Sequence, residues 1–341
     1  MHCSNPELTH YLRRPFGKFI NTVSLRHRTI IELRVDAMPS LLKATMLVLR
    51  MVRAPFFTAT IAPILVGTSL SWKINRLFDL SVFLCALFSM LLLHAAANML
   101  NDYFDHLSGA DWFQTNPVKP FTGGSRVIQE GLVKPTTMLL SGVTSLILGS
   151  LLGLWLVKVT GVTLLLIGIV GVFLAYFYTA PPIMLAHRGF GELAVGLAFG
   201  ILPTIGAYYV QSKGFDWRVL IASLPIALLI VAVLWVNEIP DAPSDERAGK
   251  RNLVVRLGKK ASAICYCLIV TCAFISLPFI ALALHSLSPL LGLVTFPTAL
   301  LAMANVVRHV FFRYDTMKAA CAMTVLTHFA MGILLSISYA L

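Results

Sequence analysis

The chain is poor in charged residues, and most of all in acidic ones. Asp and Glu together number 15 in 341 residues, and charged residues of both signs make up only 12% of the chain. A soluble domain ordinarily carries about 25% charged residues. Hydrophobic residues reach 57%, with a mean hydropathy of +0.81. The composition therefore excludes an ordinary soluble protein and predicts a polytopic membrane protein with the lipid bilayer as its surroundings.

Cysteine is also scarce, and the six cysteines form no metal-binding pattern. Cys265 and Cys267 are one residue apart, which is not the spacing of a zinc site, and no second pair follows them. We interpret all but Cys3 as small buried side chains. The sequence has no visible secretory signal peptide, and no nucleic-acid-binding motif accompanies its net charge of +12. No nucleic acid is therefore expected as a partner.

Long apolar runs fill the chain from about residue 46 onward, and strand signals are absent. A helix needs about 20 predominantly apolar residues to cross the hydrocarbon core of a bilayer. We predict an all-α protein with a basic N-terminal tail at 1–45 and a nine-helix domain at 46–341. The nine predicted spans are 54–72, 80–101, 135–156, 160–178, 190–211, 217–237, 261–284, 287–306 and 319–340.

Lysine and arginine are distributed unevenly between the two sides of these spans. With the N-terminus in the cytoplasm, 22 of the 27 basic residues fall in cytoplasmic segments and five in outer loops. Cytoplasmic loops of membrane proteins carry such an excess of Lys and Arg. We therefore expect a bacterial cytoplasmic membrane protein with a cytoplasmic N-terminus and a C-terminus on the outer side.

The few acidic residues gather in two stretches, each at the end of a long apolar run. The first, Asn-Asp-Tyr-Phe-Asp at 101–105, continues to Asp111, and the second, Asn-Glu-Ile-Pro-Asp at 237–241, continues to Asp245. Four predicted spans separate the two stretches, so both face the cytoplasm. Carboxylates at a membrane edge are costly unless something positive binds there. We therefore interpret the two stretches as one functional site.

The side chains in these stretches predict a magnesium site. If both helices continue past the membrane edge, Asn101 and Asp105 lie on one face, as do Asn237, Asp241 and Asp245. Two facing rows of carboxylates repel each other unless a cation lies between them. Carboxylate and amide oxygens favour Mg²⁺ over zinc, and Mg²⁺ held by few carboxylates keeps positions open for substrate phosphates.

Basic residues near both stretches are candidates to bind a diphosphate together with two Mg²⁺. They could equally serve only as anchors at the lipid headgroups, because cytoplasmic loops are basic in any case. The residues concerned are Lys119, Arg126, Arg247, Lys250 and Arg251.

A diphosphate bound at a membrane edge, beside a large apolar cavity, indicates a polyprenyl diphosphate whose tail the cavity would house. Ionisation of the allylic C–O bond leaves a carbocation and a diphosphate. Mg²⁺ would stabilise the departing charge, and an apolar wall would shield the carbocation from water.

Together these features resemble the UbiA superfamily of intramembrane aromatic prenyltransferases. The resemblance rests on the stretches at 101–111 and 237–245 and on the count of nine helices, and it covers the chain from about residue 46. It implies nine transmembrane helices around a central apolar cavity, with an Asp-rich site on the cytoplasmic side. It also implies a Mg²⁺-dependent enzyme that transfers a polyprenyl group from a polyprenyl diphosphate to an aromatic acceptor.

Within this family the chain is similar to the menaquinone branch, which prenylates 1,4-dihydroxy-2-naphthoate. Asp111 lies six residues beyond Asp105, whereas the corresponding acid of the 4-hydroxybenzoate branch typically comes four residues later. The segments 178–192 and 245–258 are also similar to that branch. The resemblance therefore implies transfer to 1,4-dihydroxy-2-naphthoate with loss of CO₂, which gives demethylmenaquinone.

The resemblance also implies roles for single residues. Asn101, Asp105 and Asp241 are expected to be catalytic, with Asp241 the candidate to take a proton from the acceptor. Some members have a Tyr-x-x-x-Lys motif, but here Tyr178 is followed four residues later by Pro182. Arg188 could supply the charge instead, for the diphosphate or for the carboxylate of the acceptor, or it could be only a topology anchor. The expected metal ligands are Asn101, Asp102, Asp105, Asp111, Asn237, Asp241 and Asp245. The expected substrate-binding residues are Lys119, Arg126, Tyr178, Arg188, Lys250 and Arg251.

Other interpretations stay open at this point. The acceptor could be 4-hydroxybenzoate, homogentisate, chlorophyllide or haem. The carboxylates could instead bind ions in a cation-coupled transporter, although transporter sites more often lie near the bilayer midplane. We interpret His94 and His328, which fall within predicted spans, as packing residues rather than as a base or a ligand.

Overall fold

The computed structural model describes residues 40–109, 113, 117–313 and 315–341. Residues 50–341 pack as one unit, and the fold and site described below belong to it. Helix α3 (Ser40–Met51) begins in the preceding unit. The described residues form helices and turns and no strand, as the sequence predicts. Asp111 and residues 1–39 of the predicted tail lie outside the described residues.

Eight helical segments of the described chain are long and apolar enough to cross a membrane. The predicted span at 160–178 instead forms the shorter apolar helix α8 (Thr163–Phe177), which has 15 residues. The protein is therefore an integral membrane protein, and each predicted span falls on a helix. The eight segments are η1 and α4 (Ala54–Phe57, Thr58–Asn75), α5 (Leu80–Ser108), α7 (Pro135–Thr160), α9, η3 and α10 (Gly191–Gly196, Leu197–Ile201, Leu202–Ser212), α11 (Trp217–Arg247), α12 (Leu253–Ala283), η4 and α13 (Ser288–Thr295, Phe296–Phe312) and α14 (Met317–Ala340).

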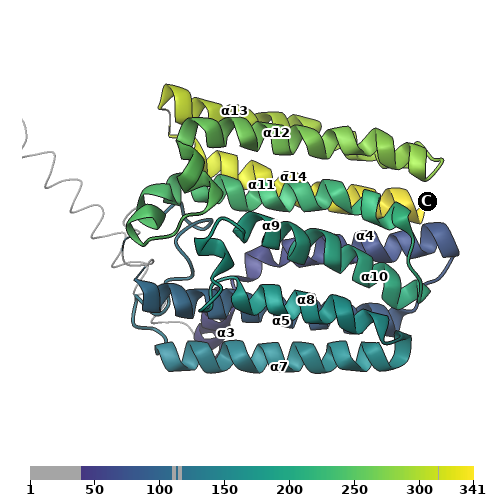
Figure 1. The fold of residues 1–341 in the computed structure, drawn as a ribbon, viewed down its shortest axis with the longest axis horizontal. Helices are drawn as coiled ribbons and strands as arrows, with labels where there is room; N and C mark the ends of the chain where they lie inside the picture. The colour runs from purple at the N-terminus through teal and green to yellow at the C-terminus, as the bar shows by residue number, and fades with distance from the viewer. Residues whose placement is uncertain (1–39, 110–112, 114–116, 314) are drawn as a thin grey trace, which may run out of the picture. The chain divides into compact units, whose positions relative to one another are not determined.

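Within residues 50–341 the long helices run side by side (Figure 1), with α5 along α7, α11 along α12 and α14, and α4 against α10 and α14. Glycine permits two of the closest approaches between neighbouring helices. A Cβ atom on Gly67 of α4 would lie 2.2 Å from the carbonyl oxygen of Thr204, and one on Gly200 of η3 would lie 2.4 Å from Cα of Ala227. Any larger residue would push these helices apart, because the interior is close-packed.

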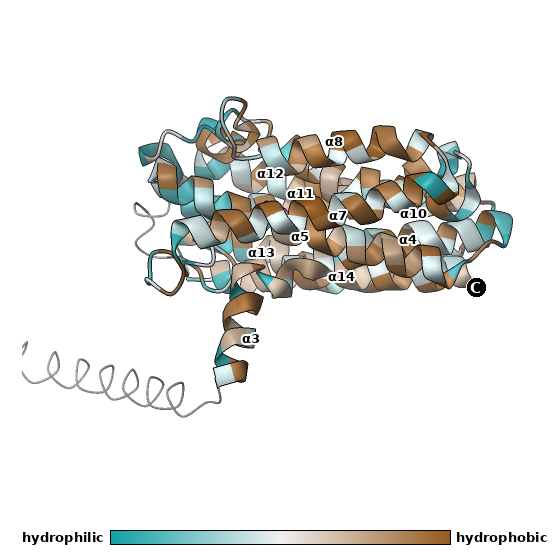
Figure 2. Ribbon diagram, turned by 90° about the horizontal axis from the view of Figure 1, so that it is seen from below, coloured by the Kyte–Doolittle hydropathy of each residue, from teal (hydrophilic) through white to brown (hydrophobic). Residues whose placement is uncertain are grey.

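Apolar residues cover the middle of the helical unit, and polar residues gather at its two ends (Figure 2). Leu140, Leu151 and Leu268 are each more than half exposed on its outside. Exposure of such an apolar surface to water is unfavourable, whereas the hydrocarbon core of a bilayer accommodates it. The interior is built around α11, whose Ile226 and Leu229 are fully buried.

Candidate active site

The first acidic stretch lies on the last turns of α5, because this helix continues beyond Asn101 to Ser108. It ends at Gly109, whose φ of 82° is left-handed and suits glycine. Asn101 and Asp105 are one helical turn apart, and Nδ2 of Asn101 donates a hydrogen bond to Oδ2 of Asp105 at 3.2 Å. The two side chains thus share one face of α5, as the spacing predicts.

The second acidic stretch lies on α11, which continues through Pro240 and Pro243 to Arg247. A proline inside a helix has no N–H to donate to the carbonyl four residues earlier. The carbonyl of Val236, four residues before Pro240, is contacted instead by the thiol of Cys321 at 3.9 Å. Packing against α14 therefore helps α11 to stay helical through the second acidic stretch. The contact with Val236 also gives a structural reason for the burial of Cys321.

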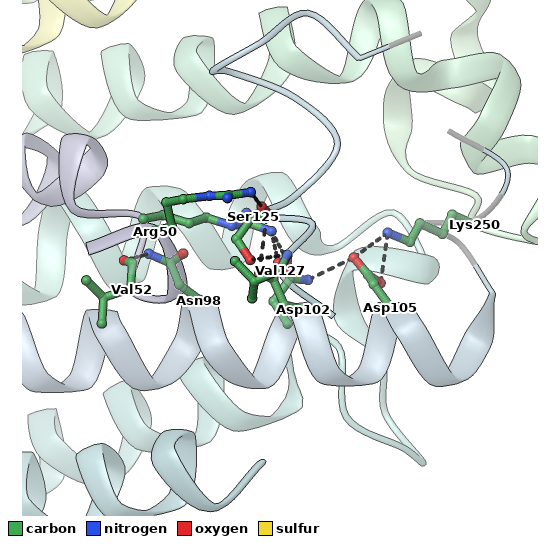
Figure 3. Close-up of polar contacts among 10 residues, drawn as sticks. Arg50, Val52, Asn98, Asp102, Asp105, Ser125, Val127 and Lys250 are labelled. Atoms are coloured by element: carbon green, nitrogen blue, oxygen red, sulfur yellow. Dashed lines mark hydrogen bonds and ion pairs between the residues drawn. The ribbon is translucent and has the colours of Figure 1, made fainter. Parts of the chain in front are cut away.

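One lysine connects the two acidic stretches. Nζ of Lys250 lies 3.0 Å from both carboxylate oxygens of Asp105 and 3.9 Å from Oδ1 of Asp245. Figure 3 shows the lysine reaching the end of α5 from a separate segment of the chain. The other oxygen of Asp245 accepts a hydrogen bond from Nδ2 of Asn252 at 2.9 Å. A single ammonium group therefore compensates carboxylates that come from two different helices.

These groups line a cavity of about 290 Å³ that is polar at one end and apolar along the rest of its length. Gly123 and Gly124, with φ of 80° and 70°, form part of the wall at the polar end, where the left-handed backbone requires glycine. Such a cavity suits a molecule with an anionic head and a hydrocarbon body. The polar lining includes Asn101, Asp105, Asn237, Asp241, Asp245 and Lys250, and the apolar lining includes Met90, Leu93, Phe199, Ile230 and Leu234.

Asp102, a predicted metal ligand, does not line this cavity. Its side chain is 2% exposed, forms an ion pair with Arg53, and accepts the backbone N–H of Ser125 at 3.2 Å (Figure 3). Arg53 also donates a hydrogen bond to Oδ1 of Asn101 at 3.3 Å. Asp102 therefore fastens the loop at Ser125 to α5. Arg53 has no predicted role in the site, although its place just before the first predicted span is a signal for this side of the membrane.

Four of the predicted basic residues also lie outside the cavity lining. Lys119 is two-thirds exposed, and its Nζ is 4.0 Å from Glu130. Arg188 donates a hydrogen bond to the carbonyl oxygen of Pro182 at 2.9 Å. These contacts shape loops, so direct binding of substrate by this group stays a prediction. The four are Lys119, Arg126, Arg188 and Arg251, and the further candidate Arg247 lies outside the lining as well.

Tyr178, by contrast, does line the cavity. Burial raises the pKa of its phenol well above the ordinary value, and the nearby carboxylates of Glu238 and Glu192 raise it further. A phenol with a raised pKa stays protonated at neutral pH. Tyr178 is therefore available as a hydrogen-bond donor at the polar end of the cavity.

Comparison with known proteins agrees with this geometry. Residues 60–332 match the UbiA prenyltransferase family. The chain belongs to this family. The family resemblance expected from the two acidic stretches is therefore confirmed.

Two curated relatives are similar in sequence. The 1,4-dihydroxy-2-naphthoate octaprenyltransferase of Bacillus subtilis is 30% identical over 62% of this chain and 66% of its own length. The 2-carboxy-1,4-naphthoquinone phytyltransferase of Synechocystis is 32% identical over 61% of this chain and 65% of its own length. The matched part thus spans a little under two thirds of each relative.

A solved structure described as a UbiA homolog from Archaeoglobus fulgidus bound to GPP and Mg²⁺ superposes with a TM-score of 0.56. The superposition covers 85% of this chain and 99% of that chain, at 16% sequence identity. At this identity the similarity shows a shared fold, and it agrees with the UbiA-like arrangement of helices described above.

In this UbiA family member, Glu192 of α9 fixes the segment that carries Lys250. Glu192 is 2% exposed, and its Oε1 accepts the N–H of Leu253, the first residue of α12, at 2.6 Å. The preceding residue, Asn252, caps α12 and also donates to Asp245. Glu192 lies in the segment 178–192 that is similar to the menaquinone branch, but no role for its side chain could be predicted from the sequence.

On the expectation that the cavity binds a prenyl diphosphate, Glu192→Ala should raise the KM for that substrate about tenfold, because it removes a buried hydrogen-bond acceptor from the start of α12. Glu192→Gln keeps an oxygen in the same place and is expected to restore most of the affinity. Steady-state kinetics at varied donor concentration would measure this. A Glu192→Ala variant with the KM of the unmodified protein would show that this contact does not position Lys250.

His94 packs against neighbouring side chains, as predicted, and its side chain also lines the cavity that contains the acidic stretches. Its Nδ1 lies 2.8 Å from Oγ1 of Thr60, and its ring lies against Phe57 and Phe199, with centroids 5.3 and 4.6 Å away. The ring is therefore held in one orientation. His328 is 1% exposed and lies outside the cavity lining, which agrees with its interpretation as a packing residue.

Proposed function

We propose that the protein transfers a polyprenyl group from a polyprenyl diphosphate to 1,4-dihydroxy-2-naphthoate, with loss of CO₂, to give the hydroquinone form of demethylmenaquinone. The observation that carries the proposal is the cavity in which both acidic stretches and Lys250 adjoin an apolar interior. The naphthoate acceptor is supported by the similarity to the Bacillus subtilis and Synechocystis proteins and by the spacing of Asp111.

Mg²⁺ fits the residues present at the polar end of the cavity. Oδ1 of Asn237 is buried and has no hydrogen-bond partner among the described residues, so it is available as a ligand. No three carboxylate, imidazole or thiolate side chains of the described chain form a metal-binding cluster by themselves. Mg²⁺ bound here would therefore take part of its coordination from the amide oxygens, from water and from substrate phosphates. The residues that would hold it are Asn101, Asp105, Asn237, Asp241 and Asp245, with Asp111 a further candidate.

In this proposal the protein's own side chains bind and orient the diphosphate. Lys250 and the phenol of Tyr178 would donate hydrogen bonds to its oxygens and favour the negative charge that develops as the allylic C–O bond breaks. Bound Mg²⁺ would add further positive charge at the leaving diphosphate. Leu93 and Phe199 belong to the apolar lining and would keep water from the carbocation.

The acceptor step balances without any further reactant. The ring carbon that carries the carboxylate forms a bond to C1 of the prenyl chain. The bond to the carboxylate then breaks, its electron pair returns to the ring, and CO₂ leaves. Asp241 lies in the cavity wall and is our candidate to hold the hydroxyl proton while the ring attacks and to return it afterwards.

The proposed topology has nine spans, with α8 as the short one. Fifteen residues rise about 22 Å, less than the roughly 30 Å of a typical hydrocarbon core. Both acidic stretches line one cavity, so the chain between them must cross the membrane an even number of times, and α8 supplies the required crossing. Local thinning of the bilayer would accommodate its length. The excess of Lys and Arg places the site on the cytoplasmic side in this proposal.

An acceptor panel tests the proposed function. The purified protein is incubated with Mg²⁺, geranyl diphosphate or octaprenyl diphosphate, and one of three acceptors: 1,4-dihydroxy-2-naphthoate, 4-hydroxybenzoate or homogentisate. We expect a decarboxylated prenylated product from the naphthoate, identified by mass spectrometry, and little or none from the other two. Product from 4-hydroxybenzoate alone would overturn the naphthoate assignment but keep the prenyltransferase.

The same preparation separates the enzyme from an ion transporter. The protein is reconstituted in liposomes and cation flux is followed in the absence of any prenyl donor. The proposal expects no flux above that of empty liposomes. Flux together with the absence of any prenylated product would overturn the proposed function.

A further inference from the structure

A second cavity, of about 450 Å³, lies among helices α4, α5, α7, α8 and α10. Its lining is almost wholly apolar. The hydroxyl of Ser89, one of its few polar groups, already donates a hydrogen bond to the carbonyl oxygen of Gly149 at 2.8 Å. The second cavity therefore offers space for hydrocarbon and no site for a polar or charged ligand.

The two cavities adjoin each other. Four residues line both of them, and these come from α5, α8 and η3: Met90, Leu93, Gly171 and Ala198. The acidic stretches line only the first cavity. These four residues therefore mark the junction that a hydrocarbon chain starting at the acidic stretches would have to pass to reach the second cavity.

Gly171 leaves the junction open on the side of α8. A Cβ atom built on Gly171 would have no neighbouring atom within 4 Å, and the same holds for Gly168, one turn away on the same helix. Packing between helices therefore does not explain glycine at either position, in contrast to Gly67 and Gly200. Both glycines line the second cavity, and Gly171 also lines the first.

We propose that the second cavity receives the distal part of the polyprenyl chain, and that Gly171 is the residue that lets a long chain pass into it. The inference rests on the proposed prenyl transfer and adds to it the substrate class, a long-chain donor. The occupant is the prenyl tail rather than a membrane lipid because the second cavity shares four lining residues with the cavity that contains the acidic stretches.

The dimensions of the cavities fit this division. Asn101 and Met90 are eleven residues apart on α5, which corresponds to about 16 Å along the helix axis. The first cavity therefore accommodates the head and the first prenyl units. The lining of the second cavity runs from Ala198 to Val210 through η3 and α10, about 18 Å more. A short donor needs only the first cavity, whereas a long donor needs both.

The test compares donor lengths in variants of the full-length protein. Gly171→Phe places a ring at the junction of the two cavities. Val170→Phe, the control, places the same ring on the preceding residue, which is 43% exposed and lines neither cavity. Both are assayed with geranyl, geranylgeranyl and octaprenyl diphosphate and with the acceptor used by the unmodified protein.

We expect Gly171→Phe to lower kcat/KM for octaprenyl diphosphate about a hundredfold, and kcat/KM for geranyl diphosphate far less, because the ring excludes the distal units by steric overlap. Val170→Phe is expected to accept all three donors as the unmodified protein does. Gly168 lies about 4.5 Å farther from the site along α8. Gly168→Phe should therefore retain geranylgeranyl diphosphate better than Gly171→Phe does.

Four outcomes of these assays decide whether the inference holds. Equal use of long and short donors by Gly171→Phe would overturn the inference and leave the proposed function intact. Equal loss of all donors in Gly171→Phe, with Gly168→Phe unaffected, would also overturn it. Absence of product from the unmodified protein with every donor would instead overturn the proposed function. A loss of kcat/KM that is confined to long donors, and that is larger in Gly171→Phe than in Gly168→Phe for geranylgeranyl diphosphate, supports the inference.

Discussion

Asp241→Asn is expected to lower kcat about a thousandfold and to leave the fold unchanged. The substitution keeps the size of the side chain and removes one negative charge from the cavity wall. The residue would then lose both its attraction for Mg²⁺ and its ability to hold the acceptor's proton. Removal of a single electrostatic group that acts in the transition state commonly costs 10²–10³ in rate, and here two effects are combined. Single-turnover measurement of prenylated product at saturating substrates measures the change.

A matched control is available on the same helix. Asp216 caps α11 at its opposite end, where its carboxylate accepts the N–H of Arg218 at 2.8 Å and pairs with the guanidinium of that residue. Asp216→Asn removes the same charge far from the cavity and is expected to leave kcat within about threefold. Normal turnover by Asp241→Asn, or equal losses in both variants, would contradict the assigned role of Asp241.

The helices could be predicted from the sequence because the bilayer imposes one simple requirement on each span. Nine apolar runs of sufficient length marked nine helices, and the structure has a helix at each. The short α8 shows the limit of this reasoning. Its apolar run reaches Tyr178, but the helix itself ends at Phe177 after 15 residues. The predicted end depended on hydropathy, whereas the observed end depends on the turn that follows.

The site could be predicted only in part, because spacing along a helix shows which residues share a face but not which partners they meet. Asn101 and Asp105 were found in this way. Asp102 belongs to the same stretch, yet its position on α5 directs it to Arg53 and Ser125. Nothing in the local sequence distinguishes it from a ligand, since its partners lie 49 and 23 residues away.

Glu192 shows the same limit more clearly. Its partner, the N–H of Leu253, is 61 residues away and is a backbone group that no side-chain pattern can indicate. The loop between α8 and α9 and the start of α12 are joined by backbone and side-chain hydrogen bonds, including one from Arg251 N to the carbonyl oxygen of His187 at 3.0 Å. Such contacts depend on the tertiary fold, so only the structure could supply the support around Lys250.

Lys250→Ala is expected to lower kcat/KM for the diphosphate substrate about a hundredfold. The ammonium group lies 3.0 Å from Asp105 and is only 13% exposed, so little water screens it. Its loss removes a charge-assisted hydrogen bond to the diphosphate and leaves the carboxylates of Asp105 and Asp245 facing each other without compensation. Kinetics with varied donor, together with the exposed Lys259→Ala on α12 as control, would measure the effect.

The same variant provides a test that does not depend on activity. If Mg²⁺ binds Asp105 and Asp245 as proposed, the ammonium of Lys250 competes with it in the unmodified protein, so added Mg²⁺ is expected to raise the melting temperature only slightly. In Lys250→Ala the melting temperature without Mg²⁺ should fall because the two carboxylates repel, and added Mg²⁺ should restore much of the difference by binding the folded state. Lys259→Ala should respond to Mg²⁺ as the unmodified protein does. Equal responses to Mg²⁺ in all three proteins would show that these carboxylates do not bind the metal, and the catalytic loss in Lys250→Ala would then have to come from its contact with the diphosphate alone.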